Sequence, residues 1–308
     1  MKEKIVVSTN KLLHELFNYT FQDEDIKETS LYINNQLTDV YYVEFTYESS
    51  KTSSFKVRLS SSSKDNLRFT IYEKMLLYIL ISNARQSKED SYFITMRKIR
   101  SIRGLKDNST STYNCYKMAL ERLKSKRVRL LPMTNSNKYK LKMIDCNILT
   151  IWNQVDMDSR ITEFNYSFND LDTSFVKNSQ KISSYFNPFS FMFKKYYSFQ
   201  MGLHLLRLIA LNNSGEKSEH REFSYKFMLK QIHKVDRKGY IDNLNYYDYI
   251  ATAKNKQSEL LKRSYMELEA ILKRLVKSKT IKSYSISERR TFKYLKDDEV
   301  KICIKFIR

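Results

Sequence analysis

Glycine and proline are scarce in this chain, and that scarcity limits the folds it can adopt. The 308 residues include four glycines and two prolines. Sandwiches, barrels and doubly wound α/β folds need many tight turns, which usually require more of both residues. No segment matches G-x-G-x-x-G or the P-loop pattern, so dinucleotide and nucleotide-phosphate loops are not expected. The sequence predicts a helix-rich α+β fold with a few β-hairpins.

Size and composition are compatible with two folded domains. Hydrophobic residues make up 42% of the chain and aromatic residues 14%, enough for packed cores. The three cysteines, Cys115, Cys146 and Cys303, lie far apart without a CxxC pair, so neither a disulfide framework nor a zinc module is expected. We expect no metal and no cofactor. The sequence shows no signal-peptide core and no apolar run of ~20 residues, so we expect a cytoplasmic protein without a membrane partner.

Positive charge is concentrated in two segments of the sequence. The net charge is +21, of which residues 51–150 contribute +15 and residues 251–308 contribute +9, whereas residues 1–50 carry −5. A structured chain this basic usually has a polyanionic partner, most often nucleic acid. A lysine-rich surface from an A/T-rich genome would explain part of the charge, but not its concentration in two segments.

The first basic segment has the pattern of a winged-helix domain. A short amphipathic helix is expected at 12–17, and strands at 40–47 and 55–59. Three helices are expected at 71–85, 95–105 and 110–125, with Gly104 ending the second. Strands at 127–133 and 138–144 would then form a hairpin. In a winged helix the third helix enters the DNA major groove, and the hairpin, or wing, contacts the neighbouring backbone.

The second half repeats this order. A strand is expected at 161–168, helices at 199–211, 223–235 and 254–277, and strands at 280–286 and 300–307. Residues 119–130 and 271–281 are alike, because each has two leucines around an arginine, then Lys-Ser-Lys, then a strand. This local repeat supports a duplicated domain. We divide the chain into an acidic N-terminal arm (1–30), a first winged-helix domain (31–170) and a second winged-helix DNA-binding domain (171–308).

Polar and basic side chains on the expected DNA-facing elements are the candidate contacts. Small polar residues and Asn near the start of a recognition helix suit base edges, whereas Lys and Arg suit phosphates. We expect base discrimination from Ser111, Asn114 and Lys117. The candidate DNA-binding residues are Arg97, Lys98, Arg100, Arg103, Thr110, Ser111, Asn114, Lys117, Lys126, Arg127, Arg129, Lys138, Lys140, Lys256, Lys262, Arg263, Arg289, Arg290 and Lys293.

Three segments of the sequence carry a resemblance to a known family, namely residues 69–80, 111–123 and 196–208. With them, residues 40–308 resemble the plasmid replication initiator family of the two-winged-helix, iteron-binding Rep type. In that family the three segments are similar to the opening helix of the first winged helix, to the recognition helix and to the helix after the inter-domain connection. The chain departs from the family in its acidic arm, in its aromatic 170–198 connection and in a shorter Tyr-to-Ala spacing within residues 111–123.

The resemblance implies a non-enzymatic initiator. Such proteins bind double-stranded DNA at direct repeats of an origin, help to open the adjacent duplex and recruit host proteins. Host helicase or initiator proteins and a second copy in a homodimer are further partners that the resemblance suggests. Each domain would place one helix in successive major grooves of the site.

Two other classes of function remain open. A winged-helix transcriptional regulator or partition protein would use the same contacts, although two reading heads on one chain favour repeated sites. A tyrosine recombinase-like enzyme would use His-x-x-Arg and a Tyr nucleophile. His204 and Arg207 have that spacing, and Tyr240, Tyr246, Tyr247, Tyr249 and Tyr265 are candidate nucleophiles. Rolling-circle nicking is disfavoured because no His-x-His pair occurs. Carboxylate pairs such as Asp156/Asp158, Asp170/Asp172 and Asp297/Asp298 could bind a metal in a nuclease, but we interpret each pair as a solvated turn. We therefore expect no catalytic residues.

Overall fold

Two compact units make up the chain in a computed structural model. The structure describes residues 5–19, 21–33, 36–50, 53–87, 91–104, 110–133, 143–157, 160–184, 186–193, 196–214, 218–225, 227–228, 254–287 and 300–307. The first unit is Val6–Lys181, and the second is Ile182–Arg308 together with Met1–Ile5. The division therefore lies after residue 181, whereas the sequence analysis placed it after residue 170.

The N-terminal segment folds with the first unit. Strand β1 (Ile5–Thr9) is followed by helix α1 (Lys11–Asn18), capped by Asn10, and by the short helix η1 (Asp23–Asp25). The expected amphipathic helix is confirmed, because Leu12, Leu13, Leu16 and Phe17 are buried. From residue 6 onward this acidic segment is thus not a separate arm, since its apolar side chains are part of the core.

Three helices form the centre of the first unit, as the sequence predicted. Helix α3 (Ile71–Ala84) begins at a capping box, in which Thr70 and Glu73 each accept the other's backbone N–H. Strand β5 (Tyr92–Thr95) leads into helix α4 (Met96–Arg103), which ends at Gly104 with φ of 66°. That left-handed conformation favours glycine. Helix α5 (Thr110–Ser125) packs against α3.

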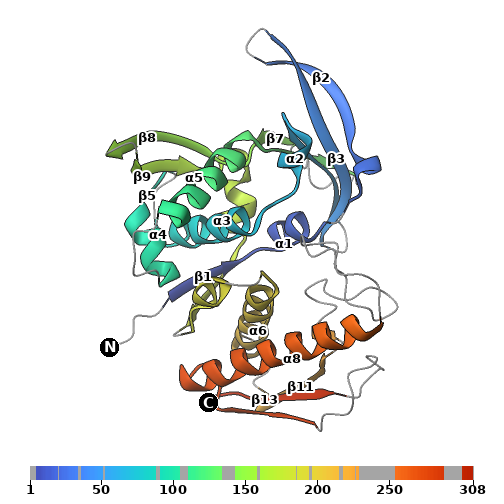
Figure 1. Cartoon of the computed structure of the whole chain (residues 1–308), viewed down its shortest axis with the longest axis vertical. Helices are drawn as coiled ribbons and strands as arrows, with labels where there is room; N and C mark the ends of the chain where they lie inside the picture. The colour runs from blue at the N-terminus through green and yellow to red at the C-terminus, as the bar shows by residue number, and fades with distance from the viewer. Residues whose placement is uncertain are drawn as a thin grey trace. The chain divides into compact units, whose positions relative to one another are not determined.

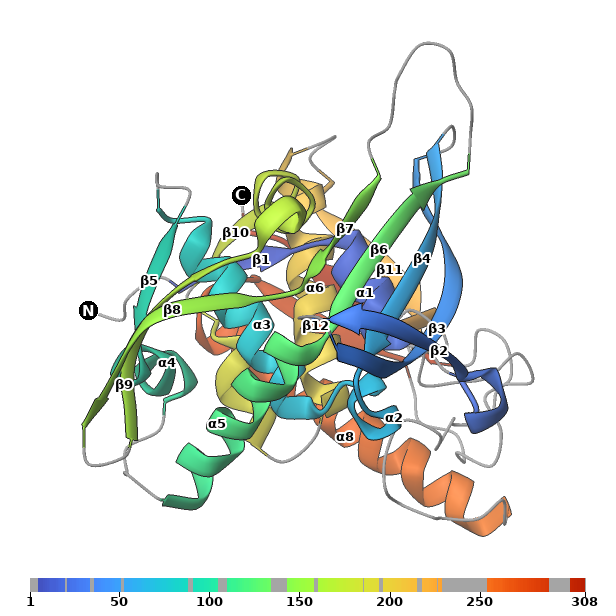
Figure 2. The ribbon, with the colours of Figure 1, turned by 90° about the horizontal axis from the view of Figure 1, so that it is seen from above.

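A three-stranded sheet covers one end of these helices. Strands β8 (Thr150–Met157) and β9 (Arg160–Ser167) form a hairpin, and β5 pairs with β9, giving the order β5-β9-β8. Its inner face buries Phe164 and Tyr166, and the Tyr166 hydroxyl donates to the backbone carbonyl of Leu80. Figures 1 and 2 show these strands beside α4 and α5. The sequence analysis predicted β9 but not β8.

A larger antiparallel sheet forms the other side of the first unit. Its strand order is β2 (Lys27–Ile33), β3 (Gln36–Ser50), β4 (Ser53–Ser61), β6 (Arg127–Pro132) and β7 (Ile144–Asn147). The inner face buries Val43, Val57, Leu59, Val128 and Leu130. Helices α2 (Lys64–Leu67), η2 (Asn169–Leu171) and η3 (Thr173–Lys177) complete the first unit. Strand β10 (Gln180–Ser184) begins in the first unit and ends in the second.

The second unit contains the same order of elements. Helix η4 (Pro188–Phe193) and helix α6 (Tyr196–Ser214) precede strand β11 (His220–Ser224). Helix α8 (Lys254–Lys277) has the predicted bounds and leads into β12 (Ser283–Ile286) and β13 (Lys301–Lys305). Residues 220–224 are a strand, so the predicted helix at 223–235 is wrong in its first two residues, and most of its remainder lies outside the described residues.

Strand order identifies the wing of each unit. In the second unit the order is β11-β13-β12, so the strand after the first helix pairs with the last strand of the hairpin. The order β5-β9-β8 in the first unit is the same arrangement. The hairpin β8–β9 is therefore the wing of the first unit. The sequence analysis assigned this role to residues 127–144, but β6 pairs with β4 and joins the larger sheet instead.

The predicted class is confirmed, because the molecule is an α+β protein with two tandem winged-helix units. Both copies of the local repeat bury equivalent side chains, namely Ala119, Leu120 and Leu123 in α5 and Ile271, Leu272 and Leu275 in α8. Among the described residues, no helix is both long enough and apolar enough to cross a membrane.

Candidate nucleic-acid interface

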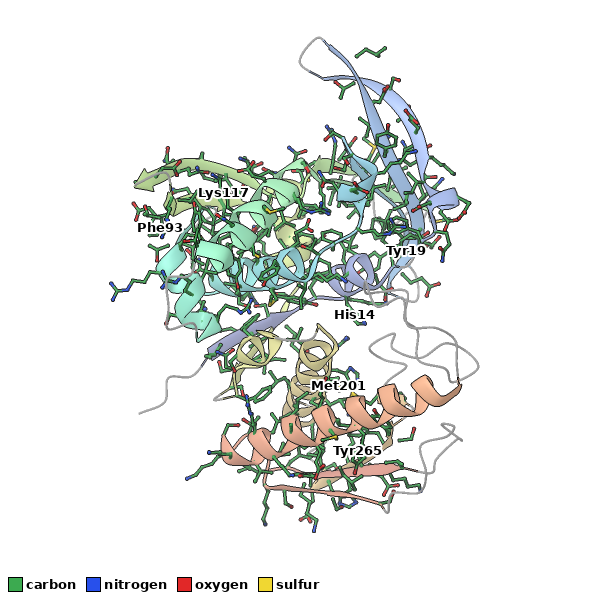
Figure 3. All side chains as sticks on the ribbon, in the orientation of Figure 1. His14, Tyr19, Phe93, Lys117, Met201 and Tyr265 are labelled. Atoms are coloured by element: carbon green, nitrogen blue, oxygen red, sulfur yellow. The ribbon has the colours of Figure 1, made fainter. Side chains whose placement is uncertain are left out.

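Helix α5 is amphipathic, and its buried side fixes which residues face outward. Tyr116, Ala119, Leu120 and Leu123 are buried, as the 3–4 spacing of apolar residues predicted. The opposite side exposes a row of mostly polar side chains, with Met118 64% exposed: Thr110, Asn114, Lys117, Met118 and Glu121. Figure 3 marks Lys117 on this helix. The side chain of Ser111 lies outside the described residues. Amide, ammonium and hydroxyl groups on one exposed helix face can contact base edges and phosphates.

The start of α5 is attached to the wing. The Tyr113 hydroxyl accepts a hydrogen bond of 2.6 Å from the backbone N–H of Ile161. The exposed Arg160, at the first position of β9, donates to the Thr110 hydroxyl over 3.2 Å. Its guanidinium also lies 5.7 Å from the centre of the Tyr113 ring. These contacts hold a cation beside the exposed end of α5.

Arg160 is a residue that the sequence analysis missed. The sequence analysis predicted a single strand from Ile161 onward and no hairpin, so Arg160 was not considered. Pairing of β9 with both β5 and β8 places Arg160 at the tip of the wing.

Helix α4 contributes further exposed cations. Arg97 and Lys98 are exposed, and Arg100 is half-buried. The helix begins at Thr95, whose hydroxyl accepts from the backbone N–H of Lys98. Arg97 and Lys98 therefore remain candidates for phosphate contacts, because their charges are open to solvent.

Arg103 does not belong to this surface, which corrects its assignment. Its side chain is buried and donates to the Tyr116 hydroxyl, and its guanidinium carbon lies 5.7 Å from the centre of that ring. Burial lowers the pKa of Arg103 and raises the pKa of Tyr116. A cation enclosed between α3, α4 and α5 joins these helices and cannot reach a phosphate.

Lys126 requires the same correction. It is fully buried in an ion pair with Glu73, whose other oxygen accepts from Arg122 at 3.0 Å. Burial lowers the pKa of Lys126 to about 8, although the Glu73 carboxylate acts in the opposite direction. Glu73 is also part of the capping box of α3. This cluster joins the end of α5 to the start of α3.

Arg127 and Arg129 lie on the outer face of the five-stranded sheet. Both pair with Asp145 of β7, at 2.6 Å and 3.8 Å. Arg127 is exposed and Arg129 half-buried, so both can present positive charge outward. Their position is separate from the wing β8–β9.

Besides Ser111, eight predicted contacts have side chains outside the described residues. Lys138, Lys140, Arg289, Arg290 and Lys293 lie outside the described residues. Lys256, Lys262 and Arg263 lie in α8, the helix equivalent to α5, but the description does not include their side chains.

The residues considered for strand transfer do not form an exposed pair. His204 in α6 is half-buried beside the Phe227 ring, and burial together with Arg207 and Arg221 lowers its pKa to about 4. Tyr265 is buried and packs edge-on against Tyr225. The other four candidate tyrosines lie outside the described residues.

Each of the two units contains a helix, a strand, a further helix and a hairpin, in this order. This order defines a protein with two winged-helix units. Comparison with known families gives a more specific result: residues 56–202 match the family model described as initiator replication protein, WH1. This part of the chain is similar to the replication initiators, and the resemblance found in the sequence is confirmed.

Two solved structures of domains 2 and 3 of RctB are also similar in fold to the chain. Each is 12% identical and covers 92% of this chain. The match covers 91% of one RctB chain with a TM-score of 0.46, and 92% of the other with a TM-score of 0.44. No curated protein sequence matches the chain.

Proposed function

We propose that this protein initiates replication by binding double-stranded DNA at direct repeats of an origin, without catalysing a reaction itself. The observation that carries the proposal is the exposed face of α5, with Asn114 and Lys117 beside the wing residue Arg160, inside a segment that matches replication initiators. Helix α5 would enter a major groove, and the wing would follow the adjacent backbone.

A base contact and a phosphate contact from α5 should respond differently to mutation. Asn114 has an amide that can pair with an adenine edge, so Asn114→Ala should cost about 1–3 kcal/mol on the cognate site only. Lys117 suits a phosphate, so Lys117→Ala should weaken all duplexes and lower the salt slope by about one. Helix α8 would have the equivalent role in the second unit.

The test is binding of the full chain to duplex DNA from around its own gene, compared with shuffled duplex, over a series of salt concentrations. Stepwise, sequence-selective complexes on direct repeats would support the proposal. The matched control is Lys177→Ala, an exposed lysine of η3, which should bind like the wild type. Equal loss on cognate and shuffled DNA for Asn114→Ala would remove its base-reading role.

The same binding experiment also distinguishes a replication initiator from a transcriptional regulator and from a strand-transfer enzyme. Selective binding to one inverted repeat would instead indicate a transcriptional regulator. Nicking of supercoiled plasmid with protein covalently attached would indicate strand transfer. If neither duplex binds, the nucleic-acid interpretation fails as a whole.

A further inference from the structure

The outer face of the five-stranded sheet carries rows of cations. The register aligns Glu44, Arg58, Arg129 and Asp145 across four neighbouring strands. The rows beside it contain Lys27 and Arg127 on one side and Lys56 on the other. The cations of β4 and β6 point outward, because side chains alternate along a strand and the intervening Val57, Leu59, Val128 and Leu130 are buried. Lys27 lies on the same face, because it pairs with Glu44.

The carboxylates of Glu44 and Asp145 are less exposed than the cations that pair with them. The Glu44 side chain is only 11% exposed, yet it contacts Lys56 at 3.0 Å, Arg58 at 2.8 Å and Lys27 at 3.6 Å. Lys27 is 60% and Lys56 47% exposed. One shielded carboxylate therefore orients three cations whose charged ends extend further into solvent.

The second cluster repeats this arrangement. Asp145 is 29% exposed and holds Arg127, which is 48% exposed, together with Arg129. Five cations thus share the face with Glu44, Asp145 and Glu48, the last at the far end of β3. The Arg58 guanidinium lies 4.2 Å from the centre of the Tyr42 ring, which further limits its motion.

Several features favour a polyanion of extended shape as the occupant. The cations lie on β2, β4 and β6 of one sheet, so their charges are spread over a surface and are not gathered at one point. Burial alone would raise the pKa of Glu44, but the hydrogen bonds from Lys56 and Arg58 outweigh it and lower that pKa. The carboxylate thus stays ionised and keeps the cations in position.

We propose that the outer face of the sheet β2-β3-β4-β6-β7 is a second nucleic-acid surface, which binds the phosphate backbone without reading sequence. It is separate from the exposed face of α5 and adds to the proposed function, on which it rests for the identity of the ligand. DNA beyond the recognised site, as a duplex or as a separated strand, is the source of the phosphates.

The first experiment measures protection of lysines by DNA in the full chain. Acetylation rates of Lys27 and Lys56 are compared without DNA, with a 20-bp shuffled duplex and with a 20-nucleotide oligo-dT. We expect both lysines to be protected severalfold, whereas the exposed Lys177 and Lys181 keep their rates. The arm that protects at the lower concentration shows whether duplex or single strand is the preferred source.

The second experiment measures the salt slope of binding to the same shuffled duplex. The double variant Lys27→Gln, Lys56→Gln leaves Arg58 to hold Glu44, so the sheet keeps its charge pairing. Its salt slope should fall by about one to two, with a roughly tenfold weaker affinity near 0.1 M salt. The matched control, Lys177→Gln with Lys181→Gln, should keep the wild-type slope.

Failure of this proposal can be told from failure of α5 recognition. An unchanged slope in the Lys27/Lys56 variant, with selective binding still dependent on Asn114, overturns only the second surface. A changed slope without any sequence preference supports the second surface and overturns recognition by α5. Equal protection by polyglutamate at matched charge would overturn the nucleic-acid ligand in favour of an acidic protein.

Discussion

Two groups of basic residues in the first unit have opposite environments, although the sequence presents them as one cluster. Arg97, Lys98 and Lys117 are exposed on α4 and α5, whereas Arg103 and Lys126 are buried near the ends of the same two helices. The exposed cations are available to phosphates. The buried ones hold the helices together through Tyr116 and Glu73. Charge in a sequence therefore indicates a binding surface only where packing leaves it exposed.

The largest expected effect comes from breaking the buried pair. Lys126→Met leaves the fully buried Glu73 with only Arg122 as an ionic partner and should lower the free energy of unfolding by about 3–5 kcal/mol. Urea unfolding followed by circular dichroism measures this. The exposed neighbour Arg127→Met is the control and should change stability little. Similar losses for the two variants would contradict the comparison.

A second buried cation adds a pH dependence to stability. Lys74 is buried and donates to the Phe17 carbonyl at the end of α1, and burial lowers its pKa to about 7. The unfolded chain should hold this proton up to pH ~10.4, so between pH 7 and 10 it binds more protons than the folded chain. The free energy of unfolding should therefore rise with pH in this window, by about 2–4 kcal/mol.

Lys74→Met identifies the source of that rise. Without the buried amine the slope between pH 7 and 10 should be smaller, and only the shift of Lys126 should remain in the same direction. Unfolding in urea at pH 6.5, 8 and 9.5 gives the slopes. A variant as pH-dependent as the wild type would show that other groups cause the rise.

The smallest expected effect comes from removing one of the exposed cations. Arg160→Ala removes the wing cation beside Thr110 and should weaken binding to any duplex, with a salt slope lower by about one. Stability should change by less than about 1 kcal/mol because the side chain is exposed. Fluorescence anisotropy over a salt series measures the slope. An unchanged salt slope would show that the wing residue Arg160 does not contact the DNA.

Much of the local structure was predictable from the sequence, because it depends on neighbouring residues. The apolar spacing in α3, α5 and α8 set their faces, and Gly104 ended α4 as its left-handed conformation requires. The outward position of Asn114 and Lys117 followed from the same spacing. The family resemblance also rested on such local patterns.

Strand pairing and burial of charge depended on contacts between distant residues. Whether β6 joins β4 or forms the wing is decided by pairing across about 70 residues, which local pattern does not encode. Lys126 and Arg127 are adjacent and both basic, but one points into the core and the other outward because successive side chains alternate. The sequence by itself determined the helices, the class of fold and the basic character of the chain. The tertiary structure alone decided which cations are exposed, because only packing brings Glu73 to Lys126 and Arg160 to the start of α5.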